Sequence, residues 1–205
     1  MVDENGNVVI NNEKAVEVNQ WYTDLYKKYK VTPTTAPSDS FAQLTAGFQA
    51  GTTAMMAHHV GSYETLYKAL GDKLGVVQMP QADPSNPATM GTMTGNVIFK
   101  SSKNKEAAWK FLSWLSGPEA TDILSQSTNG QLPVLNTLTS KPEYANKNDG
   151  WKVALASEKF AHVWPPFKGV GTIAGHTWKD NNDLALFGKI TSKEMLDNIA
   201  KALSE

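Results

Sequence analysis

The sequence predicts an α/β fold in which helices dominate, and three observations lead to that prediction. Apolar residues recur at spacings of three and four in several segments, as on one face of an amphipathic helix. Short apolar runs, stopped by glycine or proline, lie between these segments and are typical of buried strands. Hydrophobic residues make up 40% of the 205 residues, without repeats or low-complexity tracts, so the chain can bury a core.

The N-terminal half contains three predicted helices and two predicted strands. The first helix, which Asn11 or Asn12 can cap, carries an apolar face at helical spacing: Ala15, Val18, Tyr22, Leu25 and Tyr29. The second runs from about Ser40 to Ala50, with Gly51 at its C-terminal end. Residues 53–57 predict a short buried strand, residues 62–70 a helix and residues 75–80 a second strand that Pro80 stops.

The C-terminal half begins with an extended segment over residues 90–99 and continues with helices. The helix that Ser101 or Ser102 caps has an apolar stripe of Ala108, Phe111, Leu112 and Leu115. Gly117 and Pro118 separate it from a further helix over residues 119–126. Residues 151–178 read as helix-poor and rich in aromatic side chains. The last helix has the strongest start signal, because Thr191 and Glu194 form a capping box, and it buries Met195, Ile199 and Leu203.

Composition excludes several kinds of site. The net charge is −1, which provides no attraction to nucleic acid or an anionic membrane. All 19 basic residues are lysines, so guanidinium groups for two-pronged phosphate recognition are absent. The chain contains no cysteine, which excludes disulfides, thiolate catalysis and cysteine-ligated metals. No basic-then-apolar leader and no apolar stretch of about 18 residues is visible, so the protein is either intracellular or a piece whose export signal lies elsewhere.

The adjacent pair His58 and His59 is the first candidate for chemistry, and three interpretations are open. A metal site is disfavoured, because neighbours after a strand point to opposite faces and no carboxylate cluster accompanies them. The two side chains can instead form only local hydrogen bonds. Ligand contact is favoured, since strand ends that face a crevice are where open α/β folds bind ligands.

Further candidates follow in the same turn and in the aromatic-rich segment. Gly61 and Ser62 open a helix and can offer backbone N–H groups to an oxygen-rich ligand, although a plain helix cap explains them equally. Aromatic rings that can stack on a sugar are Tyr63, Trp151, Trp164, Phe167 and Trp178. The segment from Trp164 to Trp178 contains three glycines and two prolines, so its rings are expected on a loop, where functional residues concentrate.

Signals for catalysis are missing. The chain has no G-x-S-x-G elbow, no phosphate-binding glycine loop and no dinucleotide fingerprint. Paired carboxylates for glycoside hydrolysis leave no reliable trace in sequence, but no acidic residue stands in an apolar context that would raise its pKa. We therefore expect no enzyme and no cofactor.

The order of several motifs resembles the extracellular solute-binding protein family 1 of carbohydrate ABC transporters, which includes maltose-binding protein. Residues 48–55 (FQAGTTAM) are similar to the family signature F-x-x-G-x-x-A-M, and residues 75–80 (GVVQMP) resemble a strand that crosses between lobes. Residues 93–112 contain the most recognisable stretch, SKNKEAAWKFL. The pattern continues with PEA at 118–120, LPV at 132–134 and GKITSKEML at 188–196. The likeness covers nearly the whole chain but only the C-terminal half of such proteins.

The resemblance implies a type II periplasmic-binding-protein fold with two lobes, of which the N-lobe is incomplete. It places residues 1–78 and 135–205 in the C-lobe and residues 79–134 in the N-lobe. It also implies capture of a sugar or oligosaccharide between closing lobes, delivery to the permease subunits of an ABC transporter and an extracytoplasmic location, periplasmic or lipid-anchored. The alternatives are a fragment of a carbohydrate-active enzyme and a non-binding fragment that only interacts with other chains.

The residues expected to bind the ligand combine neutral hydrogen-bonding groups with aromatic rings. They are His58, His59, Gly61, Ser62, Tyr63, Thr94, Trp164, His176 and Trp178. The family often has tryptophan in the turn where this chain has residues 58–63, so Tyr63 or the histidines take its place there. Because the N-lobe is incomplete, Met93, Val97 and Phe99 should lack partners. The chain is therefore expected to self-associate or to pair with a missing N-terminal half.

Overall fold

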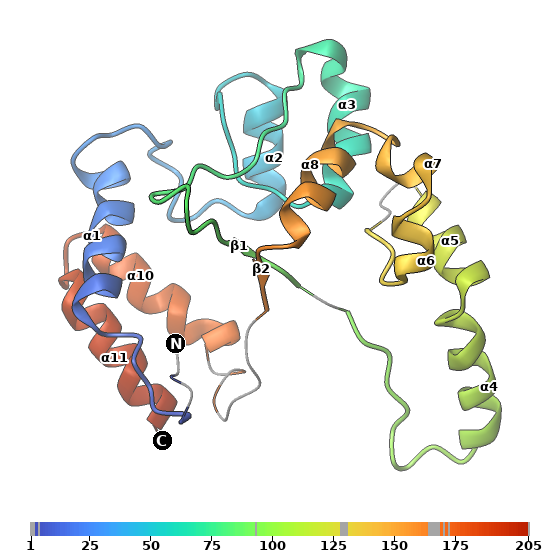
Figure 1. The fold of residues 1–205 in the computed structure, drawn as a ribbon. Helices are drawn as coiled ribbons and strands as arrows, with labels where there is room; N and C mark the ends of the chain where they lie inside the picture. The colour runs from blue at the N-terminus through green and yellow to red at the C-terminus, as the bar shows by residue number, and fades with distance from the viewer. Residues whose placement is uncertain are drawn as a thin grey trace. The chain divides into compact units, whose positions relative to one another are not determined.

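The computed structural model describes residues 3, 5–92, 94–127, 131–163, 169, 171 and 173–204. The chain divides into two compact units. Unit 1 consists of Met1–Met55 and Pro165–Glu205, and unit 2 is Met56–Trp164. Figure 1 labels the α-helices and strands of both units.

Unit 1 is helical in its described residues. Its elements are α1 (Glu13–Lys27), α2 (Phe41–Gln49), the short π-helical segment η3 (Ile173–Thr177), α10 (Trp178–Leu186) and α11 (Ser192–Ser204). Helices α1, α10 and α11 contact one another (Figure 1). Their core contains Ile10, Ala185, Met195, Leu196, Ile199 and Leu203.

The helix starts in unit 1 follow the predicted caps. The Asn12 side chain accepts a hydrogen bond from the Ala15 N–H, and Ser40 forms a reciprocal capping box with Gln43. At α11, the Glu194 N–H donates to Thr191 Oγ1 at 3.1 Å, while the Thr191 N–H donates to Glu194 Oε2 at 2.7 Å. These bonds satisfy backbone groups that a helix end leaves free, so local sequence fixes where the helices begin.

The apolar face predicted for α1 is not the face that the structure buries. Val18 is 60% exposed, Tyr22 52% and Tyr29 54%, whereas Asn19 and Thr23 are buried. Helices α10 and α11 contact a different side of α1, the side that carries Val16. Ala15 of the predicted face does pack against this core, so the period predicts the helix correctly, but most of the predicted face lies away from the core.

Unit 2 contains short helices and a minimal parallel strand pair. Its helices are η1 (Val60–Ser62), α3 (Tyr63–Leu70), η2 (Gly71–Lys73), α4 (Lys105–Leu115), α5 (Pro118–Gln126), α6 (Asn136–Thr139), α7 (Pro142–Ala145) and α8 (Asp149–Glu158). Strands β1 (Thr89–Met90) and β2 (Ala161–His162) pair in parallel, with Thr89 opposite Ala161. Gly71 ends α3 with a φ of 55°, a conformation that glycine adopts without strain.

Two strand predictions and one helix-poor prediction in unit 2 and its border are wrong. Residues 53–57 and 75–80 form no strand, because no strand among the described residues pairs with either segment. Met55 and Val77 are also more than 80% exposed instead of buried. The segment over residues 90–99, predicted as extended, belongs to β1 at Met90 and forms no helix in its other described residues up to Phe99, so this prediction is not contradicted. Residues 151–178 are not helix-poor, since α8 begins at Asp149, where Asn148 caps it.

Helices α4 and α5 both carry exposed apolar side chains. No residue of α4 is buried, and Trp109 is 66% exposed and Phe111 57%. On α5, Ile123 and Leu124 are also more than half exposed. Val97 and Phe99, which were predicted to lack partners, are 78% and 76% exposed, whereas Met93 lies outside the described residues.

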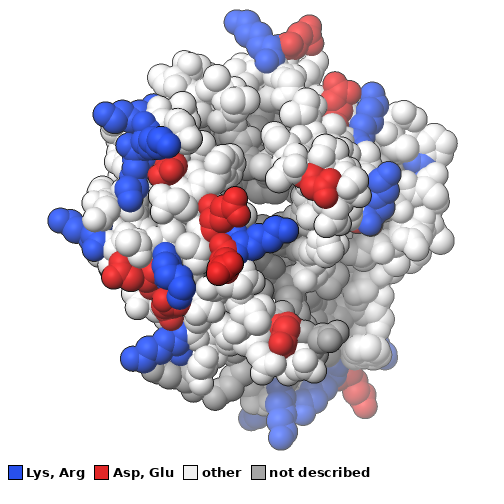
Figure 2. All heavy atoms as spheres, turned by 60° about the vertical axis from the view of Figure 1, so that its left-hand side comes forward, with Lys and Arg blue, Asp and Glu red and all other residues white. Residues whose placement is uncertain are grey.

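Charged side chains of both signs are interspersed on the face shown in Figure 2, where blue and red groups alternate over short distances. The ion pairs that the structure records between described residues are local, as between Lys152 and Asp149 at 3.2 Å. Such exposed pairs contribute little to stability.

Candidate functional site

The turn that leads into α3 positions the candidate residues 58–63. The chain is irregular through residues 55–59, and η1 then turns it into α3. Gly61 is buried, and Val60 packs against the core cluster of Leu138, Tyr144 and Trp151. The core of unit 2 therefore holds the base of this turn in place.

The two histidines and Ser62 form one hydrogen-bonded group. The His59 N–H donates to His58 Nδ1 at 3.0 Å, and Ser62 Oγ lies 3.1 Å from His59 Nε2. The centroids of the two imidazole rings are 4.8 Å apart. Burial lowers the pKa of His58, and the neighbouring charge of His59 lowers it further, so neutral imidazole is favoured. A neutral ring can accept one hydrogen bond and donate another, which suits a hydroxyl-bearing ligand.

Tyr63 is placed in packing rather than in open solvent. Its side chain is 9% exposed, and its ring stacks on Tyr67 with centroids 5.7 Å apart. A Cβ added at Gly150 would stand 2.7 Å from Tyr63 Cδ2, so α8 touches the ring through a glycine. Tyr63 thus joins α3 to α8, and its predicted contact with a ligand stays a prediction.

An aromatic pair forms the centre of unit 2. Tyr144 is fully buried, Trp151 is 1% exposed, and their rings stack with centroids 5.4 Å apart. The Tyr144 hydroxyl donates a hydrogen bond to Asp122 on α5. Burial, followed by this hydrogen bond, raises the pKa of Tyr144 to about 12. The pair therefore ties the segment from α6 to α8 to α5.

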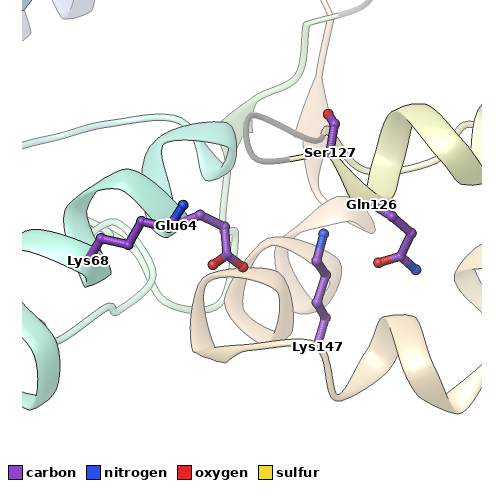
Figure 3. A pocket seen from close by; sticks show the side chains of 5 residues that line it. All are labelled: Glu64, Lys68, Gln126, Ser127 and Lys147. Carbon is purple, nitrogen blue, oxygen red and sulfur yellow. The ribbon is translucent and has the colours of Figure 1, made fainter.

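Lys147 lies between this aromatic pair and a polar cavity. Its Nζ is 4.3 Å from the centroid of the Trp151 ring and donates a hydrogen bond to the Ser125 carbonyl at 2.8 Å. Burial lowers the pKa of Lys147, and the nearby charge of Glu64 acts in the opposite direction. The cavity has a volume of about 210 Å³ and is lined by Glu64, Lys68, Gln126, Ser127 and Lys147 (Figure 3).

The remaining predicted site residues lie elsewhere. Thr94 is exposed in unit 2, and His176 is exposed in η3 of unit 1. Trp178 is partly buried and packs against the core of unit 1. Trp164 and Phe167 lie outside the described residues. The structure thus brings His58, His59 and Ser62 together within one turn, while ligand contact by any of the predicted residues stays a prediction.

The cavity residues were missed by the sequence analysis. Glu64 and Lys68, four residues apart on α3, have the spacing typical of a solvated helix face, and no sequence pattern distinguishes Lys147 from the other lysines. A usable signal was the pair Asn148 and Asp149, since an Asn before an acidic residue marks a helix start. A helix there would have placed Lys147 next to a cap rather than in a long loop.

The described residues show neither a cluster of metal ligands nor a membrane-spanning helix. They contain no group of three or more histidine, cysteine, aspartate or glutamate side chains that could hold a metal ion. Among the same residues, no helix has the length and apolar character needed to cross a membrane.

Comparison with solved structures shows the fold. Maltose-bound MalE3 of T. maritima matches 99% of this chain with a TM-score of 0.79 and 24% identity, and this chain covers 53% of it. An ABC substrate-binding protein from Listeria monocytogenes in complex with cycloalternan matches 99% of the chain with a TM-score of 0.71 and 21% identity, over 52% of its length. The chain therefore has the periplasmic-binding-protein-like fold and spans about half the length of these relatives.

Comparison of sequences gives the family. Binding proteins of Brucella abortus (strain 2308) and Brucella suis biovar 1 (strain 1330) are 29% identical over 106 residues, which are 51% of this chain and 26% of each relative. The family pattern described as bacterial extracellular solute-binding protein matches residues 1–150. With this match over most of its length, the chain belongs to the bacterial extracellular solute-binding proteins.

Proposed function

We propose that this chain is part of the substrate-binding component of an ABC transporter that captures a sugar or oligosaccharide and delivers it to membrane permease subunits. The observation that carries the proposal is the likeness in fold to two proteins whose structures contain maltose and cycloalternan. The family match supports solute binding independently of those two structures.

The proposed mechanism is capture between two lobes that close over the ligand. The lobe assignment, residues 1–78 and 135–205 against residues 79–134, is a proposal about the whole solute-binding fold. It differs from the compact units of this chain, which divide at Met55 and Trp164. In this scheme residues near 78 and 133 act as hinges, and closure removes water from the ligand's hydrogen bonds.

The proposed chemistry of recognition is neutral hydrogen bonding combined with stacking. The turn with His58, His59 and Ser62 supplies groups that both donate and accept, as sugar hydroxyls require. Trp164, Trp178 and Tyr63 remain the proposed partners for the apolar face of the sugar ring. No catalytic step is part of this proposal, and the proposed location is extracytoplasmic.

The test is thermal unfolding of the 205-residue chain, alone and within any longer polypeptide that contains it. The ligands are maltose, maltotriose and cycloalternan, with glutamate and a tripeptide as controls. A ligand present at 100 times its Kd stabilises the folded state by about 2.7 kcal/mol, so we expect melting to rise by roughly 5–10 °C. Chromatography of the same mixtures should show unchanged sugars, because turnover would indicate an enzyme.

A different outcome would reject carbohydrate capture. If the tripeptide or glutamate raises the melting temperature and none of the sugars does, the solute belongs to another chemical class. Delivery to a permease is tested separately, by uptake of the same sugar in cells that express or lack the protein. Equal uptake in both would reject the transport role.

A further inference from the structure

The polar cavity of unit 2 is built by three segments that are distant in sequence. Glu64 and Lys68 come from α3, Gln126 and Ser127 from the end of α5, and Lys147 from the turn before α8. Figure 3 shows the carboxylate of Glu64 and the ammonium group of Lys147 reaching toward the space between α3 and α5. The cavity thus collects groups of both charges at one place.

Protein contacts fix the orientation of the two innermost charges. Asn148 Nδ2 donates a hydrogen bond to Glu64 Oε1 at 2.8 Å, and this part-buried bond joins α3 to the cap of α8. Lys147 is held by the Ser125 carbonyl and by the Trp151 ring. Side chains held this way lose little further freedom when a ligand arrives, which favours binding.

The opposite charges around the cavity are not paired with each other. Among the ion pairs between residues that the structure describes, none joins Glu64 to Lys68 or to Lys147 within 4.0 Å. Nevertheless, Lys147 is close enough for the charge of Glu64 to influence its pKa. The separation leaves room for ligand atoms that contact both an acceptor and donors.

The mixture of charges selects the kind of ligand. A carboxylate or phosphate would meet the repulsion of Glu64, and a cation would meet two ammonium groups. A hydroxyl group donates one hydrogen bond and accepts others, so neighbouring hydroxyls can donate to Glu64 and accept from Lys147 and Gln126. The volume of about 210 Å³ is below the roughly 300–1,000 Å³ of sites for drug-sized ligands, and therefore fits one sugar ring.

We propose that this cavity binds a single sugar residue through adjacent hydroxyls, with Glu64 as the acceptor and Lys147 and Gln126 as donors. The inference rests on the proposed carbohydrate function and adds to it a subsite outside the residues predicted from sequence. Glu64 follows Tyr63 directly in sequence, although none of residues 58–63 lines the cavity.

The decisive variant is Glu64→Gln, examined by titration calorimetry with D-glucose and maltotriose. The substitution keeps the shape and an oxygen that can accept from Asn148, but removes the charge that strengthens a hydroxyl's hydrogen bond. We expect sugar affinity to fall about tenfold, in line with the difference between charged and neutral hydrogen bonds. The matched control is Glu158→Gln on α8, an exposed position away from the cavity, which should leave affinity unchanged.

A second readout locates the ligand without relying on a variant. Addition of D-glucose to the 15N-labelled protein should shift the side-chain amide of Gln126 and the backbone amides of Ser127 and Lys147. If Glu64→Gln lowers the melting temperature, Gln126→Leu, at an exposed position of the cavity, takes its place in the titration and should also weaken binding, because the ligand loses a donor.

The outcomes separate this inference from the proposed function. If the protein binds sugar but neither variant changes affinity and the cavity amides do not shift, the subsite is wrong and carbohydrate capture stands. If gluconate or inorganic phosphate binds at these amides more tightly than D-glucose, the cavity recognises anions and the inference is wrong. If no sugar binds the unaltered protein, both the inference and the proposed function fail.

Discussion

Trp151 and Trp109 lie on two helices of the same unit but in opposite environments. Trp151 on α8 is 1% exposed, stacks on Tyr144 and lies beneath the ammonium group of Lys147. Trp109 on α4 is 66% exposed, on a helix without a single buried residue. Both helices belong to unit 2, so the contrast does not come from a difference in domain.

The contrast separates two properties that an apolar sequence pattern combines. The apolar pattern of α4 indicates which side of the helix avoids water. It does not indicate which other part of a protein covers that side. Tyr144, Leu138 and Lys147 provide that surface for α8 within this chain. Because the chain covers about half of its solved relatives, we propose that the apolar face of α4 contacts polypeptide outside these residues or a second copy.

The largest expected effect is that of Trp151→Ala. Truncation of a buried aromatic side chain leaves a cavity and costs about 3–5 kcal/mol, so melting should fall by roughly 6–20 °C. Trp109→Ala is the matched comparison, because an exposed residue changes stability by only about 0.5 kcal/mol. Urea unfolding of both variants measures the difference. If both variants lost the same free energy of unfolding, the α4 face would be covered in solution, and the contrast between buried Trp151 and exposed Trp109 would be wrong.

The sequence predicts features that depend on neighbouring residues, but not features that depend on which distant segment covers a surface. Capping residues act within three or four positions of their own helix, so the starts of α1, α2 and α11 could be predicted from Asn12, Ser40 and Thr191. The side of α1 that is buried could not, since it depends on where α10 and α11 lie. Strands at residues 53–57 and 75–80 need a pairing partner, and none of the described residues provides one.

The candidate site shows the same limit. The local group of His58, His59 and Ser62 lies within five residues, and the sequence analysis found it as a turn. The cavity joins Glu64 to Lys147, which are 83 positions apart, through helices that no local pattern places together. Asn148 is the link, because it both caps α8 and binds Glu64. Ordinary surface lysines look the same as Lys147 in sequence.

Tyr144, the partner of Trp151 in the buried pair, should make the free energy of unfolding depend on pH. The pKa of Tyr144 is raised to about 12 in the folded state, from the ordinary value of 10.0, because burial and the bond to Asp122 favour the neutral hydroxyl. The folded state therefore keeps its proton where the unfolded state has lost it. Stability should be intact below pH 10 and decrease as the pH rises from 10 to 12, by about 2–3 kcal/mol in total.

Tyr144→Phe is the control for this titration. Other tyrosines also ionise at high pH, so the quantity of interest is the difference in unfolding free energy between the two proteins at pH 8, 10 and 11.5. The variant is expected to be less stable at pH 8, because Asp122 loses its donor, and the difference should shrink as the pH rises. A constant difference would show that Tyr144 ionises equally in both states.

A smaller effect is expected for Gly150→Ala, where the buried region is tightest. The new methyl group would stand 2.7 Å from the Tyr63 ring and must displace it, which costs about 1–3 kcal/mol. The helical preference of alanine over glycine returns up to about 1 kcal/mol. We expect a net loss of about 1 kcal/mol in urea unfolding. Gly75→Ala, where no atom lies within 4 Å, is the control and should lose nothing.

The smallest effect on stability, and the most informative one for association, is that of Trp109→Gln. The substitution removes apolar surface from α4 while leaving the buried pair of Tyr144 and Trp151 untouched. Because Trp109 is exposed, the free energy of unfolding should change by less than about 0.5 kcal/mol. Association is a different matter, since an exposed aromatic at the centre of a contact contributes much of its energy.

Sedimentation velocity over a range of concentrations measures this second property. The unaltered chain is expected to form associated species whose proportion rises with concentration, and Trp109→Gln should shift that equilibrium toward monomer by about tenfold. Lys152→Gln on α8, at an exposed polar position, is the matched control. A chain that stays monomeric at all concentrations, with or without the substitution, would reject a second copy as the partner of the α4 face. Association that the substitution leaves unchanged would place the contact on another face, and the exposed side chains of α1, Val18 and Tyr22 among them, would then be the next to replace.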